Sequence, residues 1–225
     1  HKPWVKVGIS PFGIYRPGMP EGIQANIDQY LVLYADARKW LAEGWCDYFT
    51  PQLYWRIEQT HQAYPALLRW WQHQNAKGRM VWPGNYASHI EEAPEWPASE
   101  LLNQIQVTRK MEAGGNVFFS MKPFMRNAKK ISDELIKGPY SQAAIPPILK
   151  WMGEGHAPTM PELSKVRAEG HWAADIKAPK DAFKLAIWAR FGTSWVLRAT
   201  GPTDSVRIEP RSEAGELNTV AVAGI

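Results

Sequence analysis

Four short apolar runs, each followed by a helical pattern, occupy the first 140 residues and restrict the folds open to this chain. The runs are rich in β-branched and aromatic residues and are as short as buried strands usually are. They are Trp4–Ser10, Cys46–Tyr54, Arg79–Pro83 and Asn116–Met121. Their first residues lie 33 to 42 positions apart, which is typical of strand–helix units that share a parallel sheet. The sequence therefore predicts an α/β unit.

Helical periodicity fills the intervals between these runs. Asn26 is expected to cap a first helix that stops at Gly44. A second helix is predicted around Tyr64–Trp71, where apolar residues recur at helical spacing. A third opens at Pro97, a residue favoured in the first turn, and a weaker fourth spans Ala128–Lys137.

Two architectures accommodate four such units: a small doubly wound sheet, and half of a (β/α)8 barrel, whose full size is about 250 residues. The chain starts at His1 inside a strand-like run, with neither an initiator Met nor a signal peptide. It stops in the apolar run Val220–Ile225. We therefore expect an internal piece of a longer protein, which favours the C-terminal half of a barrel.

The composition changes after this α/β region. Residues 139–162 contain five Pro and two Gly, as the exit from a domain and a linker often do. Beyond them the apolar period becomes two. Residues 184–190 alternate and are expected to pair, through a turn at Gly192-Thr193, with residues 194–199.

These patterns predict three segments. Residues 1–152 are the second half of the barrel, residues 153–162 are a linker, and residues 163–225 are an immunoglobulin-like or fibronectin-like β-sandwich. A whole sandwich has about 100 residues, so we expect this one to be truncated.

Composition excludes several classes of protein. A single Cys excludes an internal disulfide framework and a multi-Cys zinc site. The 26 basic and 22 acidic side chains give a net charge of only +4, and the basic residues are scattered, which argues against a nucleic-acid-binding face. No apolar run is long enough to span a membrane, and no dinucleotide, phosphate-loop or nucleophile-elbow motif occurs. We predict no cofactor, no metal and no nucleic-acid partner.

Aromatic and polar residues alternate just beyond the predicted strands. In parallel α/β folds the functional site lies at the carboxyl ends of the strands. Sugar rings stack their C–H faces on aromatic rings, and their hydroxyls need fixed donors and acceptors. The predicted partner is therefore a glycan, and the candidate contacts are Ser10, Arg16, Gln52, Tyr54, Trp55, Trp82, Asn85 and Ser120.

Structural roles compete with this interpretation. The aromatic residues could simply fill the barrel and its helix interfaces. Arg16 could clamp an anionic group or pair with a structural acid. Both alternatives remain open at this level.

The expected strand ends carry no carboxylate, although a glycoside hydrolase normally uses two. Asp47 begins its strand, on the side of an α/β sheet that serves stability. Glu58, Glu91, Glu92 and Glu95 lie in loops, where acids are usually solvated. No catalytic residue is assigned, and the catalytic acids are expected in the part of the barrel that precedes His1.

Several ordered motifs together resemble the glycosyl-hydrolase-like family ten, formerly a family of unknown function. The resemblance covers about residues 1–152, and the β segment that follows resembles the fibronectin-like domain that often trails this barrel. The matching motifs are Lys2–Ile14, Leu33–Leu41, Glu43–Trp55, Trp82-Pro83-Gly84 and Phe119-Ser120-Met121.

The resemblance implies a (β/α)8 barrel and hydrolysis of glycosidic bonds in a bacterial envelope polysaccharide. Characterised relatives act on peptidoglycan glycan strands stripped of their peptides, and such proteins are usually exported, often as lipoproteins. The acidic motif of the family is absent from this chain, so only strand-end contacts carry over. Asn85 departs from the pattern, which has an apolar residue at that position.

Three functions remain to be distinguished. The first is an envelope glycoside hydrolase, of which this piece alone would be inactive. The second is a non-catalytic carbohydrate-binding protein on the same scaffold, which would lack the two acids. The third is an unrelated α/β domain that binds a phosphorylated ligand, and the lack of a Gly-rich turn after any strand argues against it.

Overall fold

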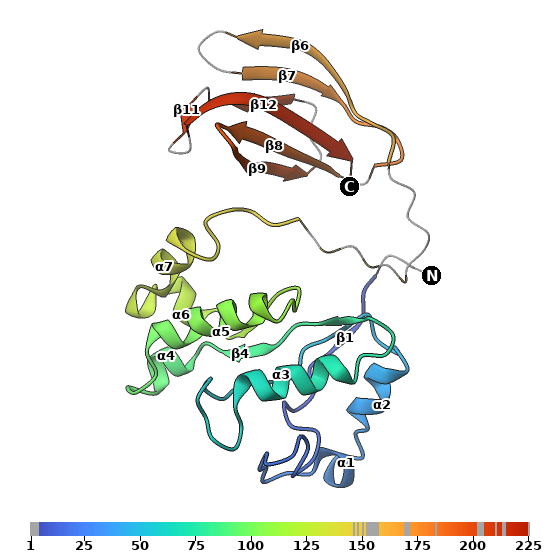
Figure 1. The fold of residues 1–225 in the computed structure, drawn as a ribbon, viewed down its shortest axis with the longest axis vertical. Helices are drawn as coiled ribbons and strands as arrows, with labels where there is room; N and C mark the ends of the chain where they lie inside the picture. The colour runs from blue at the N-terminus through green and yellow to red at the C-terminus, as the bar shows by residue number, and fades with distance from the viewer. Residues whose placement is uncertain are drawn as a thin grey trace. The chain divides into compact units, whose positions relative to one another are not determined.

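The computed structural model describes residues 5–145, 147, 149, 151, 158–168, 172–182, 184–201, 205–209, 211–212 and 215–224. The chain divides into two compact units, His1–Pro139 and Tyr140–Ile225, which are shown together in Figure 1. Residues 153–157 of the predicted linker lie outside the described residues.

The first unit contains parallel strands that follow one another in chain order. Strand β2 (Tyr48–Phe49) pairs with β1 (Gly8–Ile9) on one side and with β3 (Met80–Val81) on the other. Strand β4 (Gly84–Tyr86) pairs in parallel with β5 (Val117–Phe119).

Two single bridges join these pairs into one arrangement. Gln52 bridges in parallel to Phe12 on one side and to Gly84 on the other. The order is therefore β1, β2, the continuous stretch β3–β4, and then β5. The predicted strand–helix alternation is confirmed, and the unit is an α/β domain.

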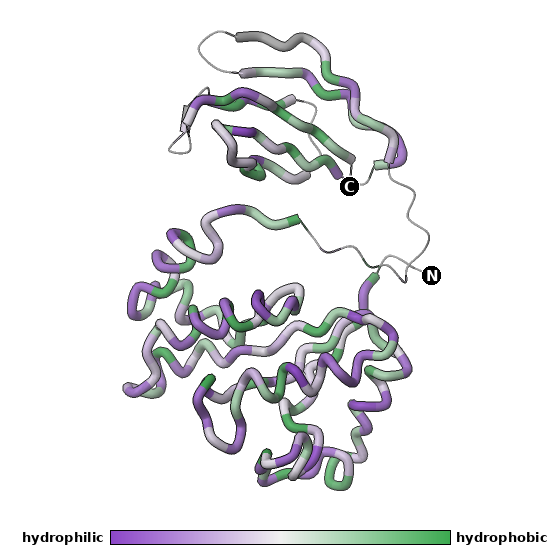
Figure 2. Tube along the Cα trace, viewed as in Figure 1, coloured by the Kyte–Doolittle hydropathy of each residue, from purple (hydrophilic) through white to green (hydrophobic). Residues whose placement is uncertain are grey.

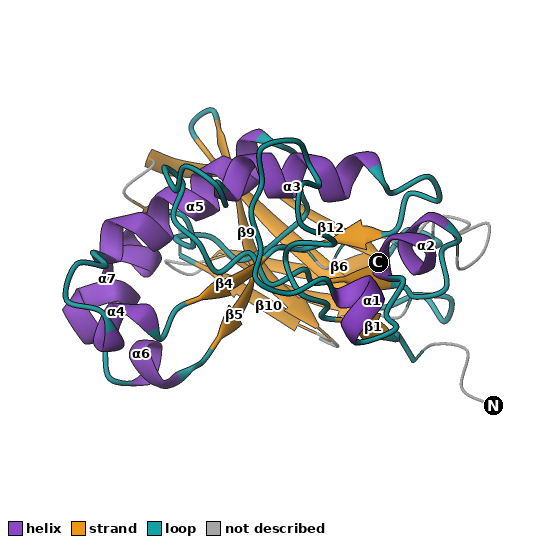
Figure 3. Cartoon of the chain, turned by 90° about the horizontal axis from the view of Figure 1, so that it is seen from below, coloured by secondary structure: helices purple, strands orange, loops and turns teal. Residues whose placement is uncertain are grey.

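Helices cover one face of these strands, and the two long ones have the predicted positions. Helix α3 (Tyr64–His73) and helix α5 (Ala98–Lys110) run side by side, as Figure 3 shows. The shorter helices are α4 (His89–Glu92), α6 (Lys122–Met125), a 3₁₀ turn (Ala128–Lys130) and α7 (Ile131–Lys137).

The prediction of one continuous helix after Asn26 was wrong. The segment forms two short helices, α1 (Gln29–Val32) and α2 (Ala37–Ala42). Each begins at an aspartate, Asp28 or Asp36, whose carboxylate accepts a hydrogen bond from a backbone N–H of the first turn. Such caps are favoured helix starts, and Tyr34 between them has φ of 52°, which interrupts the helical backbone.

The hydrophobic core of this unit lies between the strands and the helices. Ile9, Phe49 and Val81 occupy paired positions in the sheet and belong to one cluster with the apolar face of α3. The indole of Trp71 on α3 is fully buried and donates to the carbonyl of Gly13 at 2.7 Å. This bond fixes the loop that follows β1 and places that loop for the site described below.

The second unit consists of two antiparallel sheets. One has the order β10-β7-β6 and the other β11-β12-β8-β9. Hydrophobic and hydrophilic residues alternate along their strands (Figure 2). The strands are β6 (Glu162–Ala168), β7 (Trp172–Lys177), β8 (Leu185–Phe191), β9 (Ser194–Gly201), β10 (Ser205–Ile208), β11 (Arg211–Ser212) and β12 (Gly215–Gly224).

One hydrophobic cluster joins these two sheets. It contains Ile176 and Ile208 from the first sheet and Leu185, Ile187 and Phe191 from the second. The predicted hairpin at Gly192-Thr193 is present between β8 and β9. The unit is therefore all-β, with a core between two antiparallel sheets.

Candidate functional site

The carboxyl ends of the parallel strands place three aromatic rings together on the face opposite helices α3 and α5. Tyr86 and Phe119 are register partners, and residues paired in this way project from the same side of a sheet. Tyr54 lies two residues beyond Gln52. Its ring centroid is 5.0 Å from that of Tyr86 and 6.4 Å from that of Phe119. We call Tyr54, Tyr86 and Phe119 the aromatic cluster.

The aromatic cluster combines accessible apolar surface with hydroxyl groups. The ring of Phe119 is 56% exposed. The nearby Glu92 carboxylate, together with burial, raises the pKa of Tyr86. Burial, with the neighbouring Tyr86, raises the pKa of Tyr54. Both phenols therefore stay protonated at neutral pH, and a phenol hydroxyl can donate to or accept from a sugar hydroxyl.

His89 supports this cluster from the helix that follows β4. Its ring centroid lies 4.1 Å from that of Tyr86 and 4.5 Å from that of Trp96. Burial lowers the pKa of His89 below its ordinary value. The imidazole is thus neutral at pH 7 and packs as an aromatic ring between its two neighbours.

Two of the predicted contacts, Ser10 and Gln52, lie next to each other at the ends of β1 and β2. The Ser10 hydroxyl donates to the carbonyl of Thr50 at 2.9 Å, and the Gln52 amide donates to the carbonyl of Ser10 at 3.0 Å. No hydrogen bond within the described residues uses the side-chain carbonyl of Gln52, so this oxygen is available as an acceptor.

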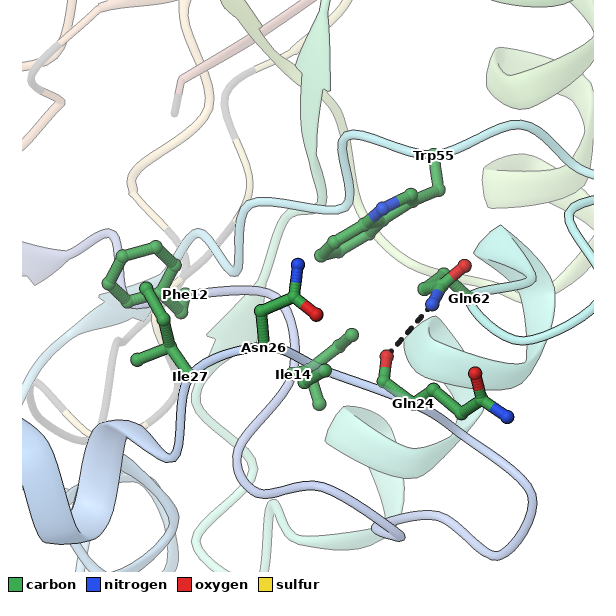
Figure 4. Close-up of a pocket in the computed structure, with 8 residues that line it drawn as sticks. Phe12, Ile14, Gln24, Asn26, Ile27, Trp55 and Gln62 are labelled. Atoms are coloured by element: carbon green, nitrogen blue, oxygen red, sulfur yellow. Dashed lines mark hydrogen bonds between the residues drawn. The ribbon is translucent and has the colours of Figure 1, made fainter.

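Trp55 lines a pocket between the loops that follow β1 and β2. The pocket has a volume of about 190 Å³. Asn26 lies between Phe12 and Trp55 in this pocket (Figure 4), and its side-chain amide has no hydrogen-bond partner among the described residues. Most of the lining surface is apolar, and Gln24 and Gln62 add polar groups beside this amide.

Arg16 takes the structural alternative that the sequence left open. Its Nε donates to Asp28 at 2.8 Å, and its guanidinium lies over the ring of Tyr30 with 5.1 Å between Cζ and the centroid. Because Asp28 also caps α1, this ion pair ties the loop after β1 to that helix.

Three other predicted contacts are engaged with neighbouring residues of the protein. Trp82 stacks on Tyr48 lower in the sheet, with ring centroids 5.1 Å apart. Ser120 forms a hydroxyl pair with Ser88 at 3.1 Å. Asn85 is fully buried and projects toward the helices.

Asn85 is the centre of a buried amide network. Its amide donates to Gln104 at 2.7 Å and to the Tyr64 hydroxyl at 3.2 Å, while its carbonyl accepts from Asn116 at 2.9 Å. These bonds join β4 to α3, to α5 and to the start of β5. Asn85 therefore acts in positioning the strand ends, and its side chain does not reach the face of the aromatic cluster.

The predicted set omitted Tyr86, Phe119 and Asn26. Alternation along the strands carries the missing signal, because Gln52 and Tyr54, like Gly84 and Tyr86, are two residues apart and share a face. The expectation that functional residues follow the carboxyl ends of the strands gives their position along a strand. It does not say from which face of the sheet each side chain projects.

Three carboxylates near the strand ends are engaged in structural contacts. Asp36 accepts from the Tyr15 hydroxyl at 3.0 Å, and Glu91 pairs with Arg126 at 3.3 Å. Glu100 accepts from the backbone N–H of Ile57 at 2.8 Å. At the other end of the sheet, Asp47 accepts from the backbone of Val7 at 2.9 Å, which is the structural role predicted for it.

Within the described part of the chain, no three His, Cys, Asp or Glu side chains gather as metal ligands would. Among the same residues, no helix has the length and apolar character needed to cross a bilayer.

Comparison with known proteins identifies the family. The sequence model described as Glycosyl hydrolase-like 10 matches residues 1–130, which is more than half of the chain. The chain belongs to this family. The resemblance noted in the motifs is therefore confirmed.

The chain spans about a third or less of the length of two curated relatives that it matches. It is 38% identical over 175 residues to the glycosyl hydrolase YngK of Bacillus subtilis (strain 168), which covers 73% of this chain and 34% of YngK. It is 34% identical over 73 residues to the glycosyl hydrolase DigH of Escherichia coli (strain K12), covering 31% of this chain and 17% of DigH. The family and these names support a glycoside-hydrolase-like role.

Proposed function

We propose that the α/β unit is the C-terminal half of a (β/α)8 barrel from a glycoside hydrolase. Consecutive parallel order supports this architecture. A doubly wound sheet reverses its strand order at a switch point, whereas β1, β2, β3–β4 and β5 follow one another without reversal. The all-β unit is the fibronectin-like domain that trails the barrel.

The aromatic cluster carries the functional part of this proposal. Its rings lie at the carboxyl ends of the strands, where barrel enzymes bind their substrates. Exposed aromatic carbon beside phenol hydroxyls and the free carbonyl of Gln52 matches the alternating apolar and polar surface of a sugar. The ligand is a glycan of the bacterial envelope, with peptide-free peptidoglycan strands as the first candidate, and the protein is exported to the envelope.

The catalytic carboxylates belong to a part of the protein beyond these 225 residues. The strand-end acids described above are committed to caps, ion pairs and backbone N–H groups. Glycoside hydrolysis normally requires one acid to protonate the leaving oxygen and a second to act as base or nucleophile. This chain supplies substrate contacts to that pair.

A non-catalytic carbohydrate-binding protein is the second candidate. The same observation favours it, because committed acids beside accessible rings give binding without hydrolysis. In that case the longer protein that contains this chain also lacks a pair of carboxylates facing the aromatic cluster.

The test compares the 225-residue chain with its full-length parent on peptide-free peptidoglycan glycan strands. We expect the chain to be retained by immobilised strands without releasing reducing ends, and the parent to release them. Reducing ends released by the chain itself would refute the placement of the acids. A parent that binds and does not hydrolyse establishes the second candidate.

A further inference from the structure

The outer face of the four-stranded sheet in the all-β unit carries a pair of tryptophans that its core does not use. On β8, Leu185, Ile187 and Phe191 point inward and are buried in the cluster between the sheets. Trp188 lies between Ile187 and Ala189 and therefore projects from the opposite face.

Register places Trp195 on the same outer face. Arg190, two residues beyond Trp188, pairs with Trp195 of β9, and Trp188 itself pairs with Ala221 of β12. Trp188, Trp195 and Ala221 line a shallow hollow of about 280 Å³. We call Trp188 and Trp195 the tryptophan pair.

The tryptophan pair is held in place and remains accessible. Trp195 is 45% exposed, and the guanidinium of Arg190 lies over its ring with Cζ 5.8 Å from the centroid. Arg190 is itself fixed by a 3.0 Å hydrogen bond to Asn218. In the described part of the unit neither indole N–H has a hydrogen-bond partner, so both donors are free.

Size and chemistry select the kind of ligand. A stable protein interface covers about 800 Å² on each partner, whereas this hollow is formed by two rings and one alanine. The outward face of a sandwich sheet is ordinarily polar, so indoles that project from this face on β8 and on the edge strand β9 point to a role outside the core between the sheets. Two apolar ring faces with free N–H donors, bordered by a guanidinium and an amide, fit the C–H faces and hydroxyls of a sugar chain.

We propose that the tryptophan pair is a second, non-catalytic glycan-binding site on the all-β unit. The ligand is an uncharged stretch of polysaccharide, because Arg190, the cation described beside the hollow, is already engaged with Asn218 and the Trp195 ring. The inference rests on the proposed function, since the bound chain belongs to the same polymer that the aromatic cluster contacts. Each site binds that polymer within its own unit.

Retention on immobilised peptide-free peptidoglycan glycan strands tests the proposal with the full 225-residue chain. Trp195→Ala and Trp188→Ala are each expected to weaken retention about tenfold, the effect of losing one aromatic stacking contact. Trp195→Phe should keep most of the retention. Trp45→Ala is the matched control, because that ring is 63% exposed in the other unit and belongs to neither site.

Circular dichroism and thermal unfolding of each variant ensure that a loss of retention reflects the site. If folded Trp195→Ala and Trp188→Ala proteins bind like wild type, the proposal is wrong. It is also wrong if either substitution converts a dimer to a monomer in sedimentation, because the pair is then an interface between copies.

A double variant, Tyr54→Ala with Phe119→Ala, separates this proposal from the proposed function. Retention lost only in the double variant overturns the tryptophan site and leaves the proposed function standing. Retention lost only in the tryptophan variants supports the second site and counts against the aromatic cluster. A wild-type chain that is not retained refutes both.

Discussion

The two faces of the parallel sheet differ in how they use polar and aromatic groups, and strand β4 shows the contrast within two residues. Asn85 projects toward the helices, is fully buried and has its amide and carbonyl bonded. Tyr86 projects from the opposite face into the aromatic cluster. The helix-facing side fixes the strand ends, and the open side carries the rings that we propose contact a ligand. The position of a residue along a strand therefore distinguishes a binding role from a structural role only when the face from which its side chain projects is also known.

The largest expected effect comes from the helix-facing side. Asn85→Ala removes three hydrogen bonds and leaves the buried carbonyl of Gln104 without the donor it has at 2.7 Å. Unpaired buried polar groups and a small cavity cost about 3 kcal/mol of unfolding free energy. Urea unfolding followed by tryptophan fluorescence measures the loss. Asn103→Ala, at an exposed position of α5, is the control and should change stability by less than about 0.5 kcal/mol. If the two substitutions lower the unfolding free energy equally, the helix-facing side of the sheet has no special role in stability.

The open face should show the reverse pattern. Phe119→Ala removes an exposed ring of the aromatic cluster, so we expect retention on glycan strands to fall about tenfold with little change in stability. Gel retardation in the presence of peptide-free glycan strands measures the affinity. Met125→Ala, which truncates a side chain that is 81% exposed on α6, should leave retention unchanged. A stability loss at Phe119 as large as that at Asn85, with retention intact, contradicts a binding role for this face.

Arg16 sharpens the comparison because it follows a strand end and yet makes structural contacts. Arg16→Ala breaks the ion pair with Asp28, whose side chains are 33% and 17% exposed. A solvent-screened pair of this kind contributes little to stability, so we expect a small loss, and glycan retention should not change. Arg69→Ala on the exposed side of α3 is the matched control in urea unfolding. Weaker retention of the Arg16 variant would assign the guanidinium to the ligand.

The substitution of Tyr15 is expected to have the smallest effect on stability, and only at high pH. Burial, together with the hydrogen bond to Asp36, raises the pKa of Tyr15 to about 12. Because the protonated phenol is favoured in the folded protein, this contribution to stability is complete below pH 10 and is lost as pH rises toward 12. Tyr15→Phe should therefore lose less stability than wild type between pH 10 and 12, as followed by thermal unfolding. Tyr34→Phe, at a side chain that is 90% exposed, should follow wild type throughout.

Sequence patterns predicted the elements better than their faces. The strand–helix alternation, helices α3 and α5 and the hairpin at Gly192-Thr193 all follow from apolar periodicity, and the structure contains them. The interruption between helices α1 and α2 at Tyr34 did not follow from apolar periodicity, because two aspartate caps compete with an otherwise continuous helical pattern.

Sequence patterns also did not predict the contacts between residues that are far apart along the chain. Nothing local indicates that Arg16 pairs with Asp28 or that Asn85 meets Gln104, since both contacts depend on how the loops and helices return to the sheet. Phe119 was missed for a related reason. Its position as the third ring of the aromatic cluster depends on the register between β4 and β5.

The three rings of the aromatic cluster are not parallel. They are inclined to one another by 28°, 23° and 36°, so no single plane lies flat against all of them. Neighbouring rings also stack on one another, with centroids 5.0 to 6.4 Å apart, so each ring covers part of the next. Under the proposed function, a sugar therefore meets the exposed ring of Phe119 and the borders of the two tyrosines, and not one flat aromatic platform.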